Sequence, residues 1–262
     1  MRDRRAEKRR RPRSSQSIRY SPIVSVERTR AAETERAPAV DCRRVRKVYA
    51  GAEPVVALEA VDLAIAPGEF LAIVGPSGGG KSTLLHLLGG IDRPTSGEIR
   101  VGGRDIAALP ETERTLYRRR EAGIVFQFFN LLPHLTVAEN VALPRLLDEA
   151  RDAEERAAEL LARVGLSARA AAHPYELSGG EMQRAAIARA LVTGARLLLA
   201  DEPTGNLDSR NGEQVLDLLD SVRRERGVTL VLATHSTEAT RRAERIIEIR
   251  DGRVSAPGRG PG

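Results

Sequence analysis

Gly75-Pro76-Ser77-Gly78-Gly79-Gly80-Lys81-Ser82-Thr83 directly follows the apolar run 70–74 and fits G-x-x-x-x-G-K-[ST], the pattern of a phosphate-binding loop. The glycines let backbone N–H groups point inward, so that they and the start of the next helix present partial positive charge to a triphosphate. Lys81 adds a full charge, and Ser82 offers a hydroxyl to Mg²⁺. A purely structural glycine-rich turn is the alternative. The apolar strand before the loop and the helix-forming residues 83–88 after it favour phosphate binding.

The chain length of 262 residues allows one large or two small domains with a real core. No apolar run approaches the roughly 18–20 uncharged residues that span a bilayer, and the N-terminus lacks the apolar part of a signal peptide. The single cysteine, Cys42, cannot form an internal disulfide. We therefore expect a protein of the reducing cytoplasm without a membrane span.

The net charge of +6 is concentrated at the N-terminus, where residues 1–20 hold nine basic and two acidic side chains. Residues 21–262 then sum to about −1, which argues against a nucleic-acid-binding domain. Residues 1–39 are rich in Arg, Ser and Pro, and we expect them to be disordered. A solvated tail is favoured over weak attraction to an anionic membrane surface. A mis-set translation start is a further alternative, because Met182 is the only other methionine.

Apolar and polar residues alternate in a way that predicts strands and helices in turn. We expect a loose Pro/Gly-rich tail after the last hairpin, over residues 255–262. The predicted strands are 45–49, 55–65, 98–101, 123–126, 197–200 and 228–233, with a hairpin of 246–249 and Val254; a polar helix ends at 118–120, and further helices cover 137–172, notably 153–164, and 209–226.

Two carboxylates, Asp201 and Glu202, end the predicted strand 197–200. Ligands bind at this edge of open α/β sheets, and a phosphate loop needs one carboxylate to hold Mg²⁺ and another to handle the attacking water. An exposed strand end is the alternative. His235 also follows a core strand, whereas the other histidines are interpreted as packing or surface residues: His86, His134 and His173.

Three further stretches have ordinary explanations when each is considered alone. Tyr49 in a strand is typical of half-buried packing, and Ser178 with Glu181 fits a helix capping box. The connection 128–136 is unusually apolar, and such a patch often meets a partner.

Taken in order, these pieces resemble the ATP-binding subunit of an ABC transporter over about residues 40–254. The phosphate loop is similar to Walker A, 177–181 to the signature motif, and 197–202 to Walker B. The stretch 205–208 resembles the D-loop. The remaining matches are Gln127 to the Q-loop glutamine, His235 to the switch histidine and Tyr49 to the aromatic residue that stacks on adenine.

The resemblance implies an α/β fold, a P-loop NTPase of the ABC ATPase type, with a RecA-like core, an antiparallel β subdomain and an inserted helical subdomain at about 128–176. The segments 126–144 and 203–208 most resemble the lipoprotein-release and macrolide-export branch (LolD-like, MacB-like), with the cell-division ATPase FtsE as a near relative. The sequence departs from the branch without removing a catalytic group, at Gly79, Met182 and Ser236.

The resemblance also implies a homodimer in which two chains hold two ATP molecules head to tail, each bound by one chain's phosphate loop and the partner's signature motif. The dimer would sit under membrane permease subunits on the inner face of the cell membrane, with no nucleic-acid partner, and Gln127 with the apolar segment after it would transmit closure to the permease. ATP and Mg²⁺ are the implied cofactors. The implied catalytic residues are Lys81, Gln127, Glu202 and His235; the nucleotide-binding residues are Tyr49, Gly75, Pro76, Ser77, Gly78, Gly79, Gly80, Lys81, Ser82, Thr83, Ser178, Gly179, Gly180 and Asp208, the last linking the two sites; and the metal ligands are Ser82, Gln127 and Asp201.

Rival classes share these motifs. Repair and chromosome-organising ATPases place coiled coils or zinc modules between Walker A and the signature, and here only about fifty residues separate Gln127 from Leu177. Translation-type ABC proteins need two cassettes, and this sequence has one. An FtsE-like regulator, which drives a membrane protein without moving a substrate, stays open as an alternative.

Overall fold

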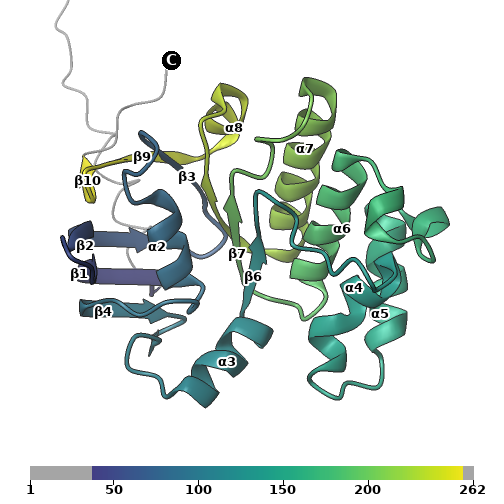
Figure 1. Cartoon of the computed structure of the whole chain (residues 1–262), viewed down its shortest axis with the longest axis horizontal. Coiled ribbons are helices and arrows are strands. Elements are labelled where there is room, and N and C mark those ends of the chain that lie inside the picture. The colour runs from purple at the N-terminus through teal and green to yellow at the C-terminus, as the bar shows by residue number, and fades with distance from the viewer. Residues whose placement is uncertain (1–36, 256–262) are drawn as a thin grey trace, which may run out of the picture. The chain divides into compact units, whose positions relative to one another are not determined.

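The strands of residues 37–255, the part of the chain that this computed structural model describes, form two sheets (Figure 1). A four-stranded antiparallel sheet has the order β2-β1-β4-β5, and a six-stranded sheet has the order β10-β9-β3-β8-β7-β6. The bounds are β1 Val40–Tyr49, β2 Val55–Ile65, β3 Phe70–Val74, β4 Ser96–Val101, β5 Arg104–Asp105, β6 Ala122–Val125, β7 Leu197–Asp201, β8 Thr229–Ala233, β9 Arg245–Arg250 and β10 Arg253–Ser255.

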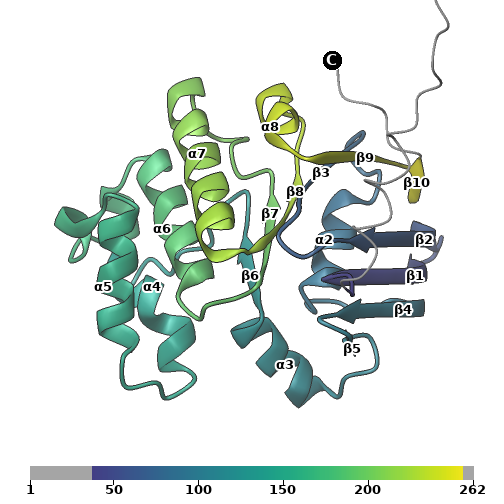
Figure 2. The ribbon, with the colours of Figure 1, turned by 180° about the vertical axis from the view of Figure 1, so that it is seen from behind.

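Helices cover the six-stranded sheet on both faces. Helix α2 lies on the side of the antiparallel sheet, and α4 to α7 lie on the opposite side (Figure 1). Seen from behind, β8 runs between β3 and β7 (Figure 2). The helix bounds are α2 Lys81–Leu88, α3 Glu111–Arg120, α4 Val137–Leu146, α5 Ala153–Arg163, α6 Gly179–Leu191, α7 Ser209–Arg226 and α8 Thr237–Arg242, with 3-10 turns at Ser167–Arg169 and Pro174–Glu176.

The central strands β3, β7 and β8 are apolar except for Asp201 and Thr229 at strand ends, because both faces of the sheet are buried. In β7, Leu198 and Ala200 face the core formed with α4 to α7, whereas Leu197 and Leu199 face the core formed with α2 and the antiparallel sheet. The strand β7 pairs in parallel with β6 and β8. Its carboxyl end therefore delivers the residues that follow it to a sheet edge shared by its neighbours.

The α/β fold with parallel and antiparallel sheets agrees with the predicted class. Residues 137–172, predicted to be helical, contain α4, α5 and the 3-10 turn Ser167–Arg169, and the chain leaves the helix between α4 and α5, where Glu149 adopts a left-handed φ of 57°. The first strand begins at Val40 rather than at Val45, because a bulge near Arg44, with φ 47°, interrupts the alternation of side chains. The bounds of the proposed helical subdomain, 128–176, stay a prediction.

The predicted disordered tails lie outside the described residues except at their inner ends, and both ends differ from expectation. Ala39 donates its N–H to the carbonyl of Ile65 at 2.8 Å, so the last residue of the predicted tail is hydrogen-bonded to the end of β2. Ser255, expected to open a loose tail, is the last residue of β10 and pairs with Glu248. In the described range, no helix combines the length and the apolar character needed to cross a membrane.

Candidate active site

The phosphate loop connects β3 to α2 and is crowded by the backbone of two other strands. Gly75 has φ 141°, and a Cβ there would lie 2.0 Å from the carbonyl oxygen of Ile249 in β9. Gly80 has φ 111°, and its Cβ would lie 2.5 Å from the carbonyl oxygen of Ala57 in β2. Only glycine fits at these two positions, because space and backbone conformation both exclude a side chain.

Helix α2 begins at Lys81 with no side-chain cap and no acidic residue in its first turn. The first backbone N–H groups of a helix lack intrahelical partners and favour an anion. The loop between the carboxyl end of β3 and the first turn of α2 thus presents backbone N–H groups with partial positive charge, as phosphate-binding loops do.

Lys81 is the charged centre of this loop and is only 6% exposed. Its ammonium donates to the carbonyls of Gly75 at 2.9 Å and Pro76 at 3.1 Å, and Nζ lies 3.2 Å from His235 Nε2. No carboxylate of the described residues forms an ion pair with it. A buried ammonium held by carbonyls and an imidazole retains an uncompensated charge, which suits an anionic ligand.

Glu202 follows β7 and is held in an uncommon conformation. Its φ is 46°, and its N–H donates to the carbonyl of Ala233 at 2.9 Å, which anchors it to the end of β8. A left-handed non-glycine residue costs conformational energy of the kind found at functional sites. The neighbouring Asp201 ends β7 at the same sheet edge.

His235 contacts both Glu202 and Lys81. Its backbone N–H donates to Glu202 Oε2 at 3.3 Å, and its Nε2 lies 3.2 Å from Glu202 Oε1. That second contact has the distance of an ion pair but lacks hydrogen-bond geometry, so Oε1 is a buried acceptor without a hydrogen-bond partner in residues 37–255. A neutral Nε2 either accepts from Lys81 or donates to Glu202, so the two contacts compete.

Gln127 lies beside the segment that follows Glu202. Its backbone carbonyl accepts a hydrogen bond from Asn206 Nδ2 at 3.0 Å. A Cβ added to Gly205 would lie 3.4 Å from Gln127 Nε2, so the amide group packs against this glycine. The residues predicted as the Q-loop and the D-loop therefore contact each other within one chain.

Ser178 opens α6 through the expected capping box. Its hydroxyl and its backbone N–H both donate to Glu181 Oε2, at 2.8 and 2.9 Å, and the pKa of Glu181 is lowered by these bonds and by Arg169. Gly180 is required by packing, because a Cβ there would lie 2.6 Å from Asn211 Oδ1. Asn211 in turn donates from its backbone N–H and its Nδ2 to the Asp208 carboxylate, at 3.0 and 2.6 Å, which lowers the pKa of Asp208.

The predicted signature motif does not join the phosphate loop. One cavity is lined by Gly75, Pro76 and His235, and another by Glu202, Asp208 and His235. Ser178, Gly179 and Gly180 line neither of them. The start of α6 lies across the central sheet from α2 (Figure 1). The structure thus unites Lys81, Glu202 and His235 and leaves the signature motif separate.

Tyr49 ends β1 and is 40% exposed, so it is not a core residue. The ammonium of Lys47 lies 4.7 Å from the centre of its ring and is fixed by Asp92 Oδ1 at 2.7 Å. One face of the ring is thus occupied by a cation, and the exposed part remains available for stacking.

The predicted metal ligands have the chemistry that Mg²⁺ prefers. Ser82, Asp201 and Gln127 supply a hydroxyl, a carboxylate and an amide oxygen. Within residues 37–255 no group of three His, Cys, Asp or Glu side chains is arranged to hold a metal. The donor set fits an ion that is completed by phosphate oxygens and water rather than a closed protein cage.

Sequence interpretation missed two residues that connect these segments, Asn206 and Arg189. Asn206 fell within the D-loop resemblance without a role of its own. Arg189 stands in the apolar run 185–191 on the inner face of α6, and a lone arginine there is the signal that could have drawn attention to it.

Comparison with known proteins gives a consistent picture. The family model described as "ABC transporter" matches residues 58–205. The chain is 48% identical over 222 residues to the macrolide export ATP-binding/permease protein MacB of Rhodopseudomonas palustris, covering 83% of this chain and 34% of that protein. The chain thus spans about a third of the length of the curated export proteins it matches.

Shorter relatives match over nearly their whole length. An uncharacterized ABC transporter ATP-binding protein of Methanocaldococcus jannaschii is 45% identical over 219 residues, covering 82% of this chain and 97% of that protein. A solved structure described as a dimeric post-hydrolysis state of the ATP-binding cassette MJ0796, bound to ADP and Pi, superposes with a TM-score of 0.79 at 42% identity. That match covers 85% of this chain and 99% of the other.

Proposed function

This chain belongs to the family of ABC transporter ATP-binding proteins, and we propose that it binds and hydrolyses ATP as half of a head-to-tail homodimer that powers an export-type transporter. The observation that carries the proposal is the meeting of Lys81, His235 and Glu202 at one sheet edge, while the signature motif lies apart. The relatives named as export proteins and the dimeric cassette support the direction of transport and the assembly.

The phosphate loop binds the nucleotide. Its backbone N–H groups and Lys81 hold the phosphates, and Tyr49 stacks on the base. The phosphates compete with the carbonyls of Gly75 and Pro76 for the donors of Lys81, and with His235 for its position. The ammonium is therefore already placed at the loop before ATP enters.

Glu202 orients the attacking water. Its buried Oε1 has no hydrogen-bond donor within the described part of the chain, so it can accept one from water. His235 fixes the other oxygen through its backbone N–H, and its side chain, 3.2 Å from Lys81 Nζ, would contact the γ-phosphate. Ser82, Asp201 and Gln127 would hold Mg²⁺, which neutralises charge on the phosphates when bound.

The partner's signature motif completes the site. The start of α6 aims its positive end at the γ-phosphate held by the other chain, and a helix terminus has its full effect only when water is excluded. Asp208 would link the two sites across the dimer. The ATP-bound dimer closes beneath permease subunits at the inner face of the membrane, and hydrolysis reopens it.

The test is the rate of ATP hydrolysis in Glu202→Gln, which keeps the size of the side chain and removes its basicity. We expect turnover to fall by about 10²- to 10⁴-fold, the usual range for loss of a general base, while ATP binding is retained. Near-normal turnover would refute the role of Glu202.

A further inference from the structure

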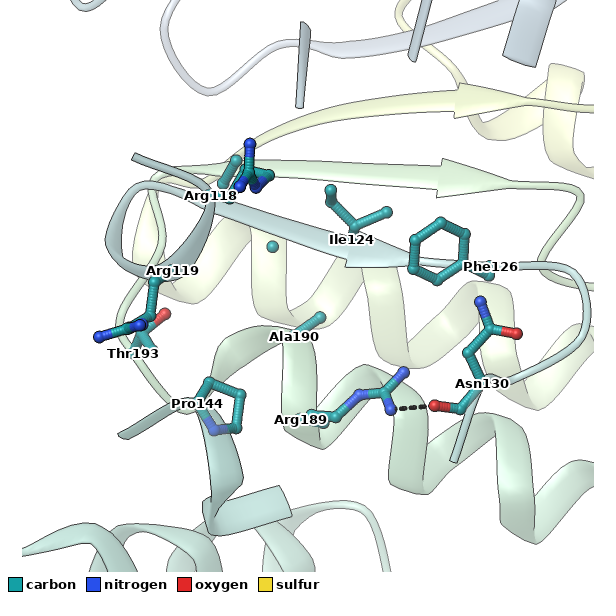
Figure 3. A pocket seen from close by; sticks show the side chains of 11 residues that line it. Arg118, Arg119, Ile124, Phe126, Asn130, Pro144, Arg189, Ala190 and Thr193 are labelled. Atoms are coloured by element: carbon teal, nitrogen blue, oxygen red, sulfur yellow. Dashed lines mark hydrogen bonds between the residues drawn. The ribbon is translucent and has the colours of Figure 1, made fainter. Parts of the chain in front are cut away.

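Arg189 is a charged side chain on the inner face of α6 that no part of the proposed mechanism uses. It is flanked by the buried residues Ala188 and Ala190. Its guanidinium donates to two successive backbone carbonyls, Phe129 at 2.8 Å and Asn130, the second of which is visible in Figure 3. Burial lowers the pKa of Arg189, and no carboxylate among the described residues pairs with it. Removing a guanidinium from water costs free energy that its hydrogen bonds must offset. The two bonds to carbonyls therefore indicate a role for Arg189.

The loop that accepts these bonds has an unusual backbone. Phe129 has φ 57° and Asn130 has φ 50°. Two successive left-handed residues are uncommon without glycine, and a bulky residue such as phenylalanine rarely adopts this conformation. This turn brings both carbonyl oxygens toward α6, where the planar fork of one guanidinium satisfies them together.

The same loop contacts both segments that the proposed mechanism needs. At its start, the carbonyl of Gln127 is held by Asn206, two residues before Asp208. At its turn, the Phe129 ring lies near the signature motif, since a Cβ on Gly179 would be 3.9 Å from Phe129 Cζ. The loop after Gln127 is therefore fixed between the D-loop and α6.

Arg189 contributes hydrogen bonds here rather than close packing. It borders a cavity of about 230 Å³ that is also lined by Phe126, Asn130 and Pro144 (Figure 3). Because this side chain already borders a cavity, a shorter side chain at position 189 would not create a new void in a packed core.

We propose that Arg189 is a positioning residue that fixes the left-handed turn at Phe129 and Asn130 and thereby sets Gln127 relative to the signature helix α6. This inference rests on the proposed function. Arg189 touches no nucleotide; it acts through Gln127, which serves the chain's own ATP, and through α6, which serves the partner's ATP. A change at one site is then transmitted to the other through a single half-buried guanidinium.

The test compares Arg189→Met with the wild-type full chain in steady-state ATP hydrolysis and in ATP binding. Methionine keeps an aliphatic stem and removes both donors. We expect kcat to fall by about 10- to 100-fold, the scale of a small misplacement of a reacting group, with ATP affinity nearly unchanged. Arg189→Lys should recover part of the loss, because an ammonium can serve one carbonyl but lacks the fork. Arg184→Met is the matched control on the same helix, since in residues 37–255 Arg184 makes no side-chain hydrogen bond or ion pair, and it should leave kcat unchanged.

A second pair of variants tests the turn without touching Arg189. Asn130 is exposed, so substitution there should not impair folding. Asn130→Val disfavours a left-handed φ and should reproduce the loss of kcat, whereas Asn130→Gly permits it and should keep kcat near wild type. The double variant Arg189→Met with Asn130→Val should have a kcat no lower than that of the more severe single variant, because both changes release the same left-handed turn.

Wild-type kcat in Arg189→Met, or in Asn130→Val if Arg189→Met fails to fold, would overturn the inference. The inference would also be overturned if Arg189→Met lowered the melting temperature but left kcat unchanged at temperatures where the variant is folded. Such a result would show that Arg189 only stabilises the fold. Neither result affects the proposed function, which fails separately if the wild-type chain does not hydrolyse ATP.

Discussion

At the residue scale, the identity of the site residues follows from sequence, but the contacts among them do not. The glycine pattern and the acidic strand end identified Lys81 and Glu202 from their chemistry, and the family resemblance added His235. That His235 lies 3.2 Å from both Lys81 and Glu202 depends on three strands meeting at one edge. Arg189 escaped notice because its partners are backbone carbonyls, which have no sequence signature.

Lys81→Ala should abolish measurable ATP binding, because it removes the only full positive charge in the phosphate loop. Equilibrium titration of the purified chain with ATP measures the loss. Circular dichroism serves as the control, and the spectrum should match that of the wild type. An unchanged ATP affinity would show that the loop does not bind phosphate in the proposed way.

At the element scale, predictions succeeded where local signals agree and failed where backbone irregularity overrides them. Helix α7 was predicted over 209–226 and is observed over the same range, because Asp208 caps its start and Gly227, with φ 63°, ends it. The start of β1 was missed because a bulge breaks the two-residue period. The break between α4 and α5 lies in a stretch whose composition still favours helix.

The packing of β6 on α6 gives a stability prediction. A Cβ on Gly123 would lie 2.3 Å from the carbonyl oxygen of Ala190, whose backbone cannot move without shifting α6. Gly123→Ala should therefore lower the free energy of unfolding by about 1–3 kcal/mol, the usual cost of overpacking.

Gly212→Ala is the matched control for this change. The nearest atom to its Cβ would be 3.6 Å away, an ordinary contact, and Gly212 lies within α7. The added methyl group should raise the free energy of unfolding by about 0.5–1 kcal/mol through helix propensity. Urea denaturation of both variants measures the difference, and equal stability of the two would contradict the packing argument.

At the scale of the whole molecule, the central feature is the separation of the two segments that we propose form one nucleotide site. The phosphate loop and Glu202 lie along the edge formed by β3, β7 and β8. The signature motif opens α6 on the other side of the sheet (Figure 1). A site shared by two chains was predicted only from the family resemblance. The spacing of residues within one chain carries no information about contacts between two chains.

In the proposed function, ATP joins two chains by binding one phosphate loop and the partner's signature motif. The most direct measurement is analytical ultracentrifugation of Glu202→Gln with and without ATP and Mg²⁺. We expect monomer without nucleotide and dimer with ATP. Adding Gly179→Asp, where a Cβ fits at 3.4 Å from Leu207, should abolish the dimer and spare ATP binding, because its carboxylate repels the partner's triphosphate. Glu202→Gln that stays monomeric at saturating ATP, or a dimer that survives Gly179→Asp, would contradict the account.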